Sequence, residues 1–178
     1  MRRTVALAVW AGFAGSWIGC KKAPPPDVPV LTGSGKYSQV LKDFQMQDIL
    51  NGAKNMVVES VEGRLLDSEH VADVDKPRVT FFKQGAVSSH LIAPQGRVGM
   101  ETHEVLAWGG VTVVTPDSAT LTTDRLRYDP QKQRLLSDDP VRLEKPDSIT
   151  VGVGLDATPD LSRVRIGHEK VYVKKHRD

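Results

Sequence analysis

The 178-residue chain lacks most of the residue patterns on which catalysis and cofactor binding depend. It contains no Walker motif, no Gly-x-Ser-x-Gly motif and no glycine-rich nucleotide-binding fingerprint after a strand. Its single cysteine, Cys20, excludes an internal disulfide and any site built from several cysteines. None of the histidines has metal-ligand spacing to another histidine or to this cysteine. The five histidines are His70, His90, His103, His168 and His176.

Two remaining signals for a chemical site are weak. Asp124 and Asp138-Asp139 are candidates for paired carboxylates, but Asp138-Asp139 lies in an expected turn, where acidic residues are solvated or cap the backbone. Gly152 and Gly154 form a lone Gly-x-Gly inside an expected strand, where a bulge or close packing is the usual reason for glycine. We therefore expect no enzyme, no metal and no cofactor. An enzyme that uses the scattered histidines is a third hypothesis.

Aromatic residues are also scarce, at 6% of the chain, whereas charged residues make up 26%. The length of about one domain, with so few large apolar side chains, suits a thin, extended β-structure. Of the 24 lysines and arginines, Arg2 and Arg3 belong to the expected leader, and the remainder balances the 22 acidic residues. A balanced chain has no basic face, which argues against nucleic acid as a partner.

The N-terminus has the pattern of a signal peptide. Met1-Arg2-Arg3 is basic, and residues 4–18 are uncharged and mostly apolar, which is shorter than the roughly 20 residues of a transmembrane helix. Cys20 follows Gly19 directly, as the lipid-modified cysteine of a lipoprotein does, although Trp17 stands where leucine is usual. We predict that Cys20 is lipidated. An ordinary free cysteine and an uncleaved, marginally short anchor are the alternatives.

The expected organisation has four parts. Residues 1–19 are the signal peptide, and residues 20–36 are the lipidated N-terminus and a linker whose Pro24-Pro25-Pro26 run favours an extended chain of roughly 3.1 Å per residue. Residues 37–174 form one β-domain, and residues 175–178 form a charged tail.

Beyond residue 53, short alternating segments separated by turns predict a dozen or so antiparallel strands and no helix. Residues 37–50 fit either a helical face or a strand, and the hairpin turn Asn51-Gly52 favours the strand. In the expected strand 120–128 the apolar residue Leu121 is at an odd position and Leu126 at an even one. They can share one face only if an extra residue lies between them, which predicts a bulge. The clearest alternation is 149–157. The other expected strands are 56–61, 64–74 after a turn at Glu62-Gly63, 78–83, 86–93, 110–115, 120–128, 134–137, 161–166 and 170–173.

A repeat supports this all-β reading. Residues 105–118 and 135–148 both run from an apolar pair through a polar turn into an alternating strand, and both end in Pro-Asp-Ser. A period of thirty residues indicates stacked hairpins that bury their apolar faces only against neighbours.

Most apolar residues of these strands must form an ordinary core, and some are candidates for lining a groove that holds an acyl chain. The candidate interior residues are Val79, Phe81, Val87, Leu91, Val111, Val113, Leu121, Leu126, Val141, Leu143, Val151, Val153 and Leu155.

The segment GGVTVVTPDSATLTTDRLRYDPQKQRLLSDDPVRL, followed by GVGLDA, resembles the LptC family of lipopolysaccharide-export proteins. The likeness covers roughly residues 40–173. It rests on the order and spacing of the residues that mark the strands and turns of successive β-hairpins. It is carried by Gly110-x-Val-x-Val, Leu121-Thr122-Thr123-Asp124, Tyr128-Asp129, Ser137-Asp138-Asp139-Pro140-Val141 and Gly154-Leu155.

The resemblance implies an open, twisted antiparallel β-jellyroll whose interior holds the acyl chains of lipopolysaccharide. It implies a place on the periplasmic face of the inner membrane, between an ABC transporter (LptB, LptF and LptG) and an LptA-like bridge protein of similar fold. Val171, Tyr172 and Val173 are the candidate edge for adding a partner strand. One departure is the expected lipid anchor on Cys20, because many members use a transmembrane helix. The alternative function is a structural envelope lipoprotein whose β-stack is a platform for protein interactions.

Overall fold

The computed structural model describes residues 37–173, which form twelve β-strands and one short 3-10 helix. The expected signal peptide, Cys20, the linker and the charged tail lie outside these residues. The strands are β1 (Gln39–Leu50), β2 (Ala53–Leu66), β3 (Val71–Asp75), β4 (Arg78–Lys83), β5 (Ala86–Ile92), β6 (Gln95–Gly99), β7 (Val105–Val114), β8 (Thr120–Asp129), β9 (Arg134–Glu144), β10 (Ser148–Ala157), β11 (Val164–Ile166) and β12 (Lys170–Val173), with the 3-10 helix at Asp67–Glu69.

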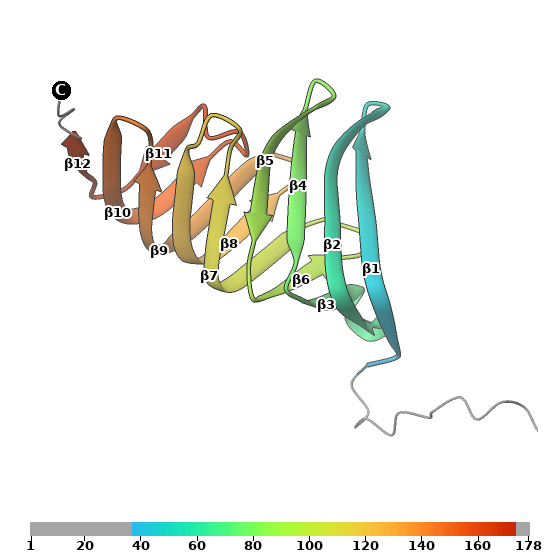
Figure 1. Ribbon diagram of the computed structural model, residues 1–178. Coiled ribbons are helices and arrows are strands. Elements are labelled where there is room, and N and C mark those ends of the chain that lie inside the picture. Colours follow the sequence, from blue (N-terminus) through green and yellow to red (C-terminus); the bar gives the residue numbers. More distant parts are fainter. Residues whose placement is uncertain (1–36, 174–178) are drawn as a thin grey trace, which may run out of the picture. The chain divides into compact units, whose positions relative to one another are not determined.

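All twelve strands belong to one antiparallel sheet, an all-β arrangement consistent with a β-jellyroll (Figure 1). The order is β11-β10-β9-β8-β7-β5-β4-β2-β3-β6, with β1 paired to β2, β12 paired to β10 and β6 paired to β7. The strand expected for residues 37–50 is confirmed as β1, and the turn at Asn51-Gly52 joins it to β2.

The sheet is folded into two layers. Layer A contains β4, β5 and β12, layer B contains β3, β6 and β11, and the six longest strands take part in both layers. In β7, for example, Val105–Val98 is a pair in layer B, whereas Val113–Leu91 is a pair in layer A. The shorter strands follow the same path in two pieces each, because β3 continues into β4, β5 continues into β6 and β11 continues into β12. The described chain is therefore an antiparallel meander of nine passes, each crossing from one layer to the other.

Each pass bends where it leaves one layer for the other, and these bends form a fold line. In β7 the bend is a bulge at Gly109 and Gly110, whose positive φ angles of 87° and 98° suit residues without a Cβ. Pro77 and Pro94 separate the paired pieces β3/β4 and β5/β6, where a residue without an N–H is tolerated. A register shift between Thr123 and Arg127 bends β8, so the bulge predicted there is confirmed.

The core consists of side chains that face each other across the two layers. In layer A, cross-strand pairing aligns one inner row over nine passes, Met46, Val58, Val79, Leu91, Val113, Leu121, Leu143, Thr150 and Val171. In layer B it aligns a second row, Leu65, Ala72, Val98, Val105, Tyr128, Leu135, Ala157 and Val164. The central members of both rows are 0–1% exposed, so burial of apolar surface holds the layers together.

Several expected boundaries are wrong for one reason. The predicted turn at Glu62-Gly63 lies within β2, and Asp138-Asp139 lies within β9. Both sites are bends on the fold line, where polar residues interrupt the alternation without reversing the chain. The polar segment inside each copy of the repeat is likewise a bend, at Gly109-Gly110 and at Asp138-Asp139.

Two further strand boundaries differ from expectation. The expected strand 64–74 is broken by the 3-10 helix at Asp67–Glu69, and β6 has too little apolar pattern to be expected. The Pro-Asp-Ser segments are true turns, between β7 and β8 and between β9 and β10.

Candidate functional site

The space between the two layers is the candidate site, because the apolar candidates meet there. Ten of the thirteen candidate interior residues lie on inner faces of the sheet and are 0–5% exposed. They are Val79, Phe81, Leu91, Val111, Val113, Leu121, Leu126, Val141, Leu143 and Leu155. The Phe81 and Tyr128 rings, from layer A and layer B, make an edge contact with centroids 4.8 Å apart.

The assignment of Val87, Val151 and Val153 to the interior is wrong. Val151 pairs with Arg142 and Lys170 on the outer face, and Val153 is 48% exposed. A bulge at Gly154, whose φ is 83°, separates these valines from Leu155. Because side chains alternate with period two, this extra residue places the two parts of the 149–157 alternation on opposite faces.

A similar irregularity explains Val87. The pairing of β4 with β5 shifts between Phe81 and Phe82, so that Phe81 faces Ser89 and Phe82 faces Val87. Val87 therefore belongs to the outer face and is 40% exposed.

Opposite the fold line, the free rims of the layers meet in a line of polar contacts, which we call the seam. His103 Nδ1 of layer B lies 2.8 Å from Asp48 Oδ1 of layer A. Asn55 Nδ2 donates hydrogen bonds to Asp48 Oδ2 at 2.6 Å and to Tyr128 Oη at 3.1 Å. Further along, Gln133 Nε2 donates to Asn55 Oδ1, and the Lys83 ammonium pairs with Asp160.

Sequence reasoning missed the seam because its partners come from distant passes. Asp48 and His103 are 55 residues apart, and Lys83 and Asp160 are 77 residues apart. No spacing motif connects such residues, and only the folding of the meander brings the two rims together.

Two groups of the seam have shifted pKa values. Burial opposes the ionisation of Asp160, but hydrogen bonds from Lys83 and from hydroxyl groups of its own loop outweigh burial and hold the pKa of this carboxyl well below its usual range. Burial raises the pKa of the Tyr128 hydroxyl, which therefore remains protonated beside Asn55.

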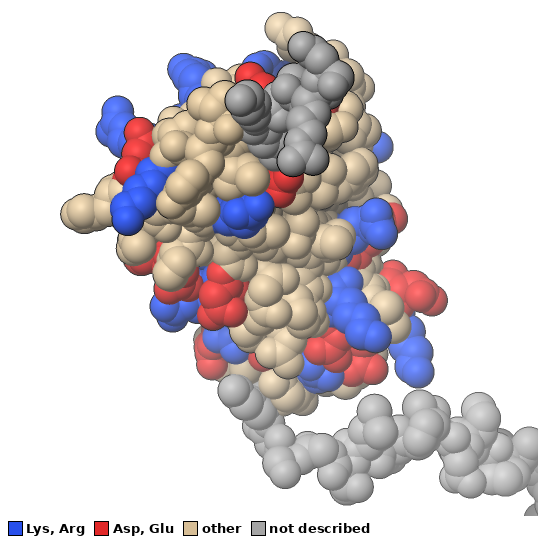
Figure 2. Space-filling view, turned by 60° about the vertical axis from the view of Figure 1, so that its left-hand side comes forward, with Lys and Arg blue, Asp and Glu red and all other residues tan. Residues whose placement is uncertain are grey.

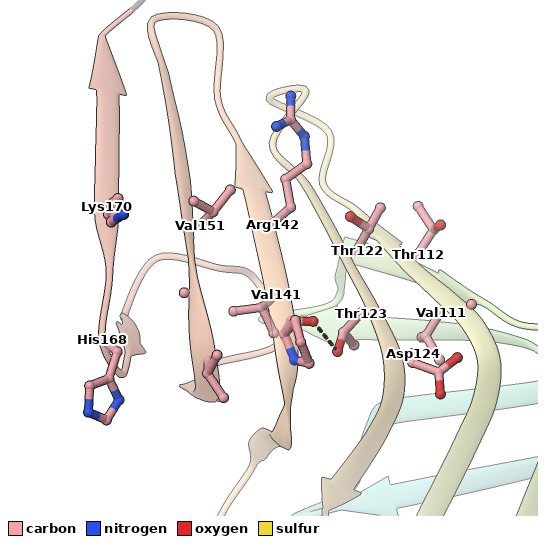
Figure 3. Close-up of a pocket in the computed structure, with 14 residues that line it drawn as sticks. Val111, Thr112, Thr122, Thr123, Asp124, Val141, Arg142, Val151, His168 and Lys170 are labelled. Carbon is pink, nitrogen blue, oxygen red and sulfur yellow. Dashed lines mark hydrogen bonds between the residues drawn. The ribbon is translucent and has the colours of Figure 1, made fainter.

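A shallow groove of about 740 Å³ follows the fold line on the last five passes (Figure 3). Its lining combines small neutral residues such as Thr112, Thr122 and Val151 with the charged groups of Arg142, Asp124 and Lys170. Thr123 Oγ1 donates a hydrogen bond to the Pro140 carbonyl at 3.0 Å, which ties β8 to β9 at the bend. The groove is open and its charges are mixed, so it does not have the character of a closed ligand site.

The rest of the described surface carries dispersed polar and charged groups. No three His, Cys, Asp or Glu side chains within residues 37–173 are grouped to hold a metal ion. Basic and acidic side chains are interspersed over the face seen in Figure 2. Pairs such as Arg125 with Asp139, at 2.8 Å, join neighbouring strands across the bend. Within residues 37–173 no helix has the length and apolar character needed to cross a membrane.

The two ends of the meander are edges. Among the described strands β1 pairs with β2 alone and β12 pairs with β10 alone. The candidate partner edge lies on β12, where Val171 and Tyr172 are each 56% exposed and Val173 is 80% exposed. Val171 pairs with Thr150 and so continues the inner row of layer A past the last covered strand.

An antiparallel sheet folded around an apolar interior, with exposed edges at both ends and polar contacts at a seam, places the chain in the class of all-β, jellyroll-like proteins. The model of the LptC family, described as lipopolysaccharide-assembly, LptC-related, matches residues 34–171, and the chain belongs to this family. Membership makes the chain a component of lipopolysaccharide transport, associated with the inner membrane on its periplasmic side, in a family of transport components rather than enzymes. A comparison with curated proteins found no match.

The Lys83–Asp160 pair predicts a pH-dependent contribution to stability. Because the pKa of Asp160 is lowered on folding, its contribution is fully present above the unfolded value of about 4 and is lost as the pH falls through the folded value. We expect Asp160→Asn to reduce the free energy of unfolding by about 1–2 kcal/mol at pH 7, and by progressively less below pH 4.

Urea denaturation at pH 7, 5 and 3 measures this difference. Asp147→Asn, in the exposed turn between β9 and β10, is the matched control and should change stability by less than about 0.5 kcal/mol. An Asp160→Asn deficit that is the same at pH 3 as at pH 7 would contradict the assignment.

Proposed function

We propose that the domain carries lipopolysaccharide by holding its acyl chains between layer A and layer B. The observation that supports this most is the inner row of layer A, which is apolar at every pass except Thr150. Eight strand spacings of about 4.8 Å give the row a length of roughly 38 Å from β1 to β12. An acyl chain laid along such a row is removed from water, which is worth roughly 25 cal/mol per Å² of apolar surface.

The layers must separate before an acyl chain can lie between them, because the inner side chains already fill the interior. Val58, Val79 and Leu121 are 0% exposed. Along the fold line the layers are joined by continuous backbone, whereas at the seam they are joined by a few side-chain contacts. Side-chain hydrogen bonds contribute only about 1 kcal/mol each, so the seam is the side at which the layers open.

The wider arrangement extends this proposal. Lipid arrives from the inner-membrane ABC transporter formed by LptB, LptF and LptG, and leaves toward an LptA-like bridge protein whose strand pairs with β12. The support is the exposure of Val171 and Val173, which continue the inner face at the edge of the sheet. An open, twisted jellyroll on residues 37–174, tethered through residues 20–36 and a lipid on Cys20, completes the proposal.

Site-specific photocrosslinking separates lipid carriage from a purely structural platform. A diazirine-bearing aliphatic residue at Leu121 or Leu143, on the inner row, should form adducts with lipopolysaccharide in the envelope. The same residue at Val114 or Val153, on the outer face, should form none. Adducts at neither inner position, with the variants folded, would favour the interaction platform.

Closing the seam covalently should block loading. In a Cys20→Ala background, Asp48→Cys and His103→Cys are joined by a short, reducible bis-maleimide, and binding of purified lipopolysaccharide is measured. We expect binding to be lost in the crosslinked protein and restored by reduction, because the layers can then part. The control joins Thr122→Cys to Arg142→Cys, a cross-strand pair within layer A, and should bind normally. Equal binding by both crosslinked proteins would place the opening elsewhere.

The lipid anchor has a separate test. Metabolic labelling with a palmitate analogue should label the full chain and leave Cys20→Ala unlabelled. Label that persists in the variant would refute lipidation at this residue.

A further inference from the structure

A pocket of about 280 Å³ lies on the seam, beside the Lys83–Asp160 pair. Layer A contributes Lys83 and Ser88 to its wall, and layer B contributes residues from the β8–β9 and β10–β11 connections. Phe81 and Tyr128 also line the pocket, and both belong to the buried core. The pocket is therefore a polar opening whose base is the apolar interior.

Positive charge dominates the lining. Four cations, Lys83, Lys132, Arg134 and Arg163, surround the pocket with one carboxylate, Asp160. They come from three separate stretches of sequence, around residues 83, 132–134 and 163, so the balanced charge of the whole chain gives no sign of them.

Two of these cations have carboxylate partners just outside the lining. Lys132 Nζ lies 3.3 Å from Asp129, and Arg134 Nε lies 2.5 Å from Asp156. The guanidinium of Arg163 makes no ion pair within the described part of the chain. The side chains of Lys132 and Lys83 are 71% and 62% exposed, so both ammonium groups can reorient toward a ligand.

We propose that this pocket binds a phosphate ester on the headgroup of the lipid whose acyl chains occupy the interior. The inference rests on the proposed function and adds the chemistry by which the headgroup is recognised. Arginine and lysine are the side chains that bind phosphate oxygens through charge-assisted hydrogen bonds. A phosphate held by Lys132 and Arg163 leaves the attached acyl chains directly above Phe81 and Tyr128, at the point where the layers part.

The same site couples headgroup binding to opening of the seam. Asp160 accepts hydrogen bonds from Thr158 and Ser162 of its own loop, whereas its partner Lys83 comes from the opposite layer and has a side chain that is 62% exposed. A phosphate group competes with Asp160 for this ammonium group. When Lys83 turns to the phosphate, the molecule loses the Lys83–Asp160 contact that holds the two rims together. The ligand therefore shifts the population toward the open form.

Equilibrium binding to the full chain with three probes tests the site. The probes are a hexaacylated lipid A with its phosphates, the same lipid without phosphates, and inorganic phosphate. The double variant Lys132→Gln/Arg163→Gln spares the Lys83–Asp160 contact. We expect it to weaken binding of the phosphorylated lipid about tenfold and to leave the dephosphorylated lipid within about twofold of the unmodified chain.

The control, Lys42→Gln/Arg78→Gln, removes the same two residue types from exposed positions away from the pocket and should change neither affinity. Equal weakening of both lipids, or no effect on either, overturns the headgroup site while the proposed function stands. Binding of inorganic phosphate as tight as that of the lipid, and lost in the double variant, assigns the pocket to the free anion instead. If the unmodified chain binds neither lipid, the proposed function fails and the headgroup site fails with it.

Discussion

The structure depends on one constraint. An antiparallel sheet with a single apolar face must bury that face by packing one half of the sheet against the other half. A meander can do so only by folding along a line that every pass crosses. Each pass must therefore bend once near its middle, and the bends must align from the first strand to the last. Glycine, proline and polar residues occur at these positions because they permit bulges or need no ladder hydrogen bond. The inner rows, the seam and the open edges all follow from this single fold line.

The fold line also makes the two long sides of the interior unequal. On one side the layers are covalently continuous, because every pass crosses there from one layer to the other, so the layers cannot separate along that side. On the other side only side chains meet, from rims that are distant in sequence. A carrier has to hold an apolar ligand securely and still admit and release it. An interior that is continuous on one side and joined by polar contacts on the other has both properties without a separate lid.

Strand content and turns could be read from the sequence because they are local. Alternation identified most strands, Asn51-Gly52 and the Pro-Asp-Ser segments identified turns, and the parity change between Leu121 and Leu126 identified a bend. The faces were harder to assign. The five residues from Ile149 to Ala157 alternate without a visible break, yet Gly154 divides them between the outer and inner faces. A bulge changes the face without changing the composition, so periodicity alone could not separate Val153 from Leu155. The seam could not be predicted at all, because its contacts depend on which passes of layer A and layer B lie opposite each other in the folded meander.

The order of pairing has a consequence for how the chain acquires its structure. Each pass pairs with the passes directly before and after it in the chain, and no strand waits for a partner from the far end. Loop closure is the main entropic barrier in β-proteins, and here each closure spans a single hairpin. Folding can then proceed as a sequential zipping of hairpins from either end. Such a chain would leave few unpaired strands exposed to aggregation while it is being completed.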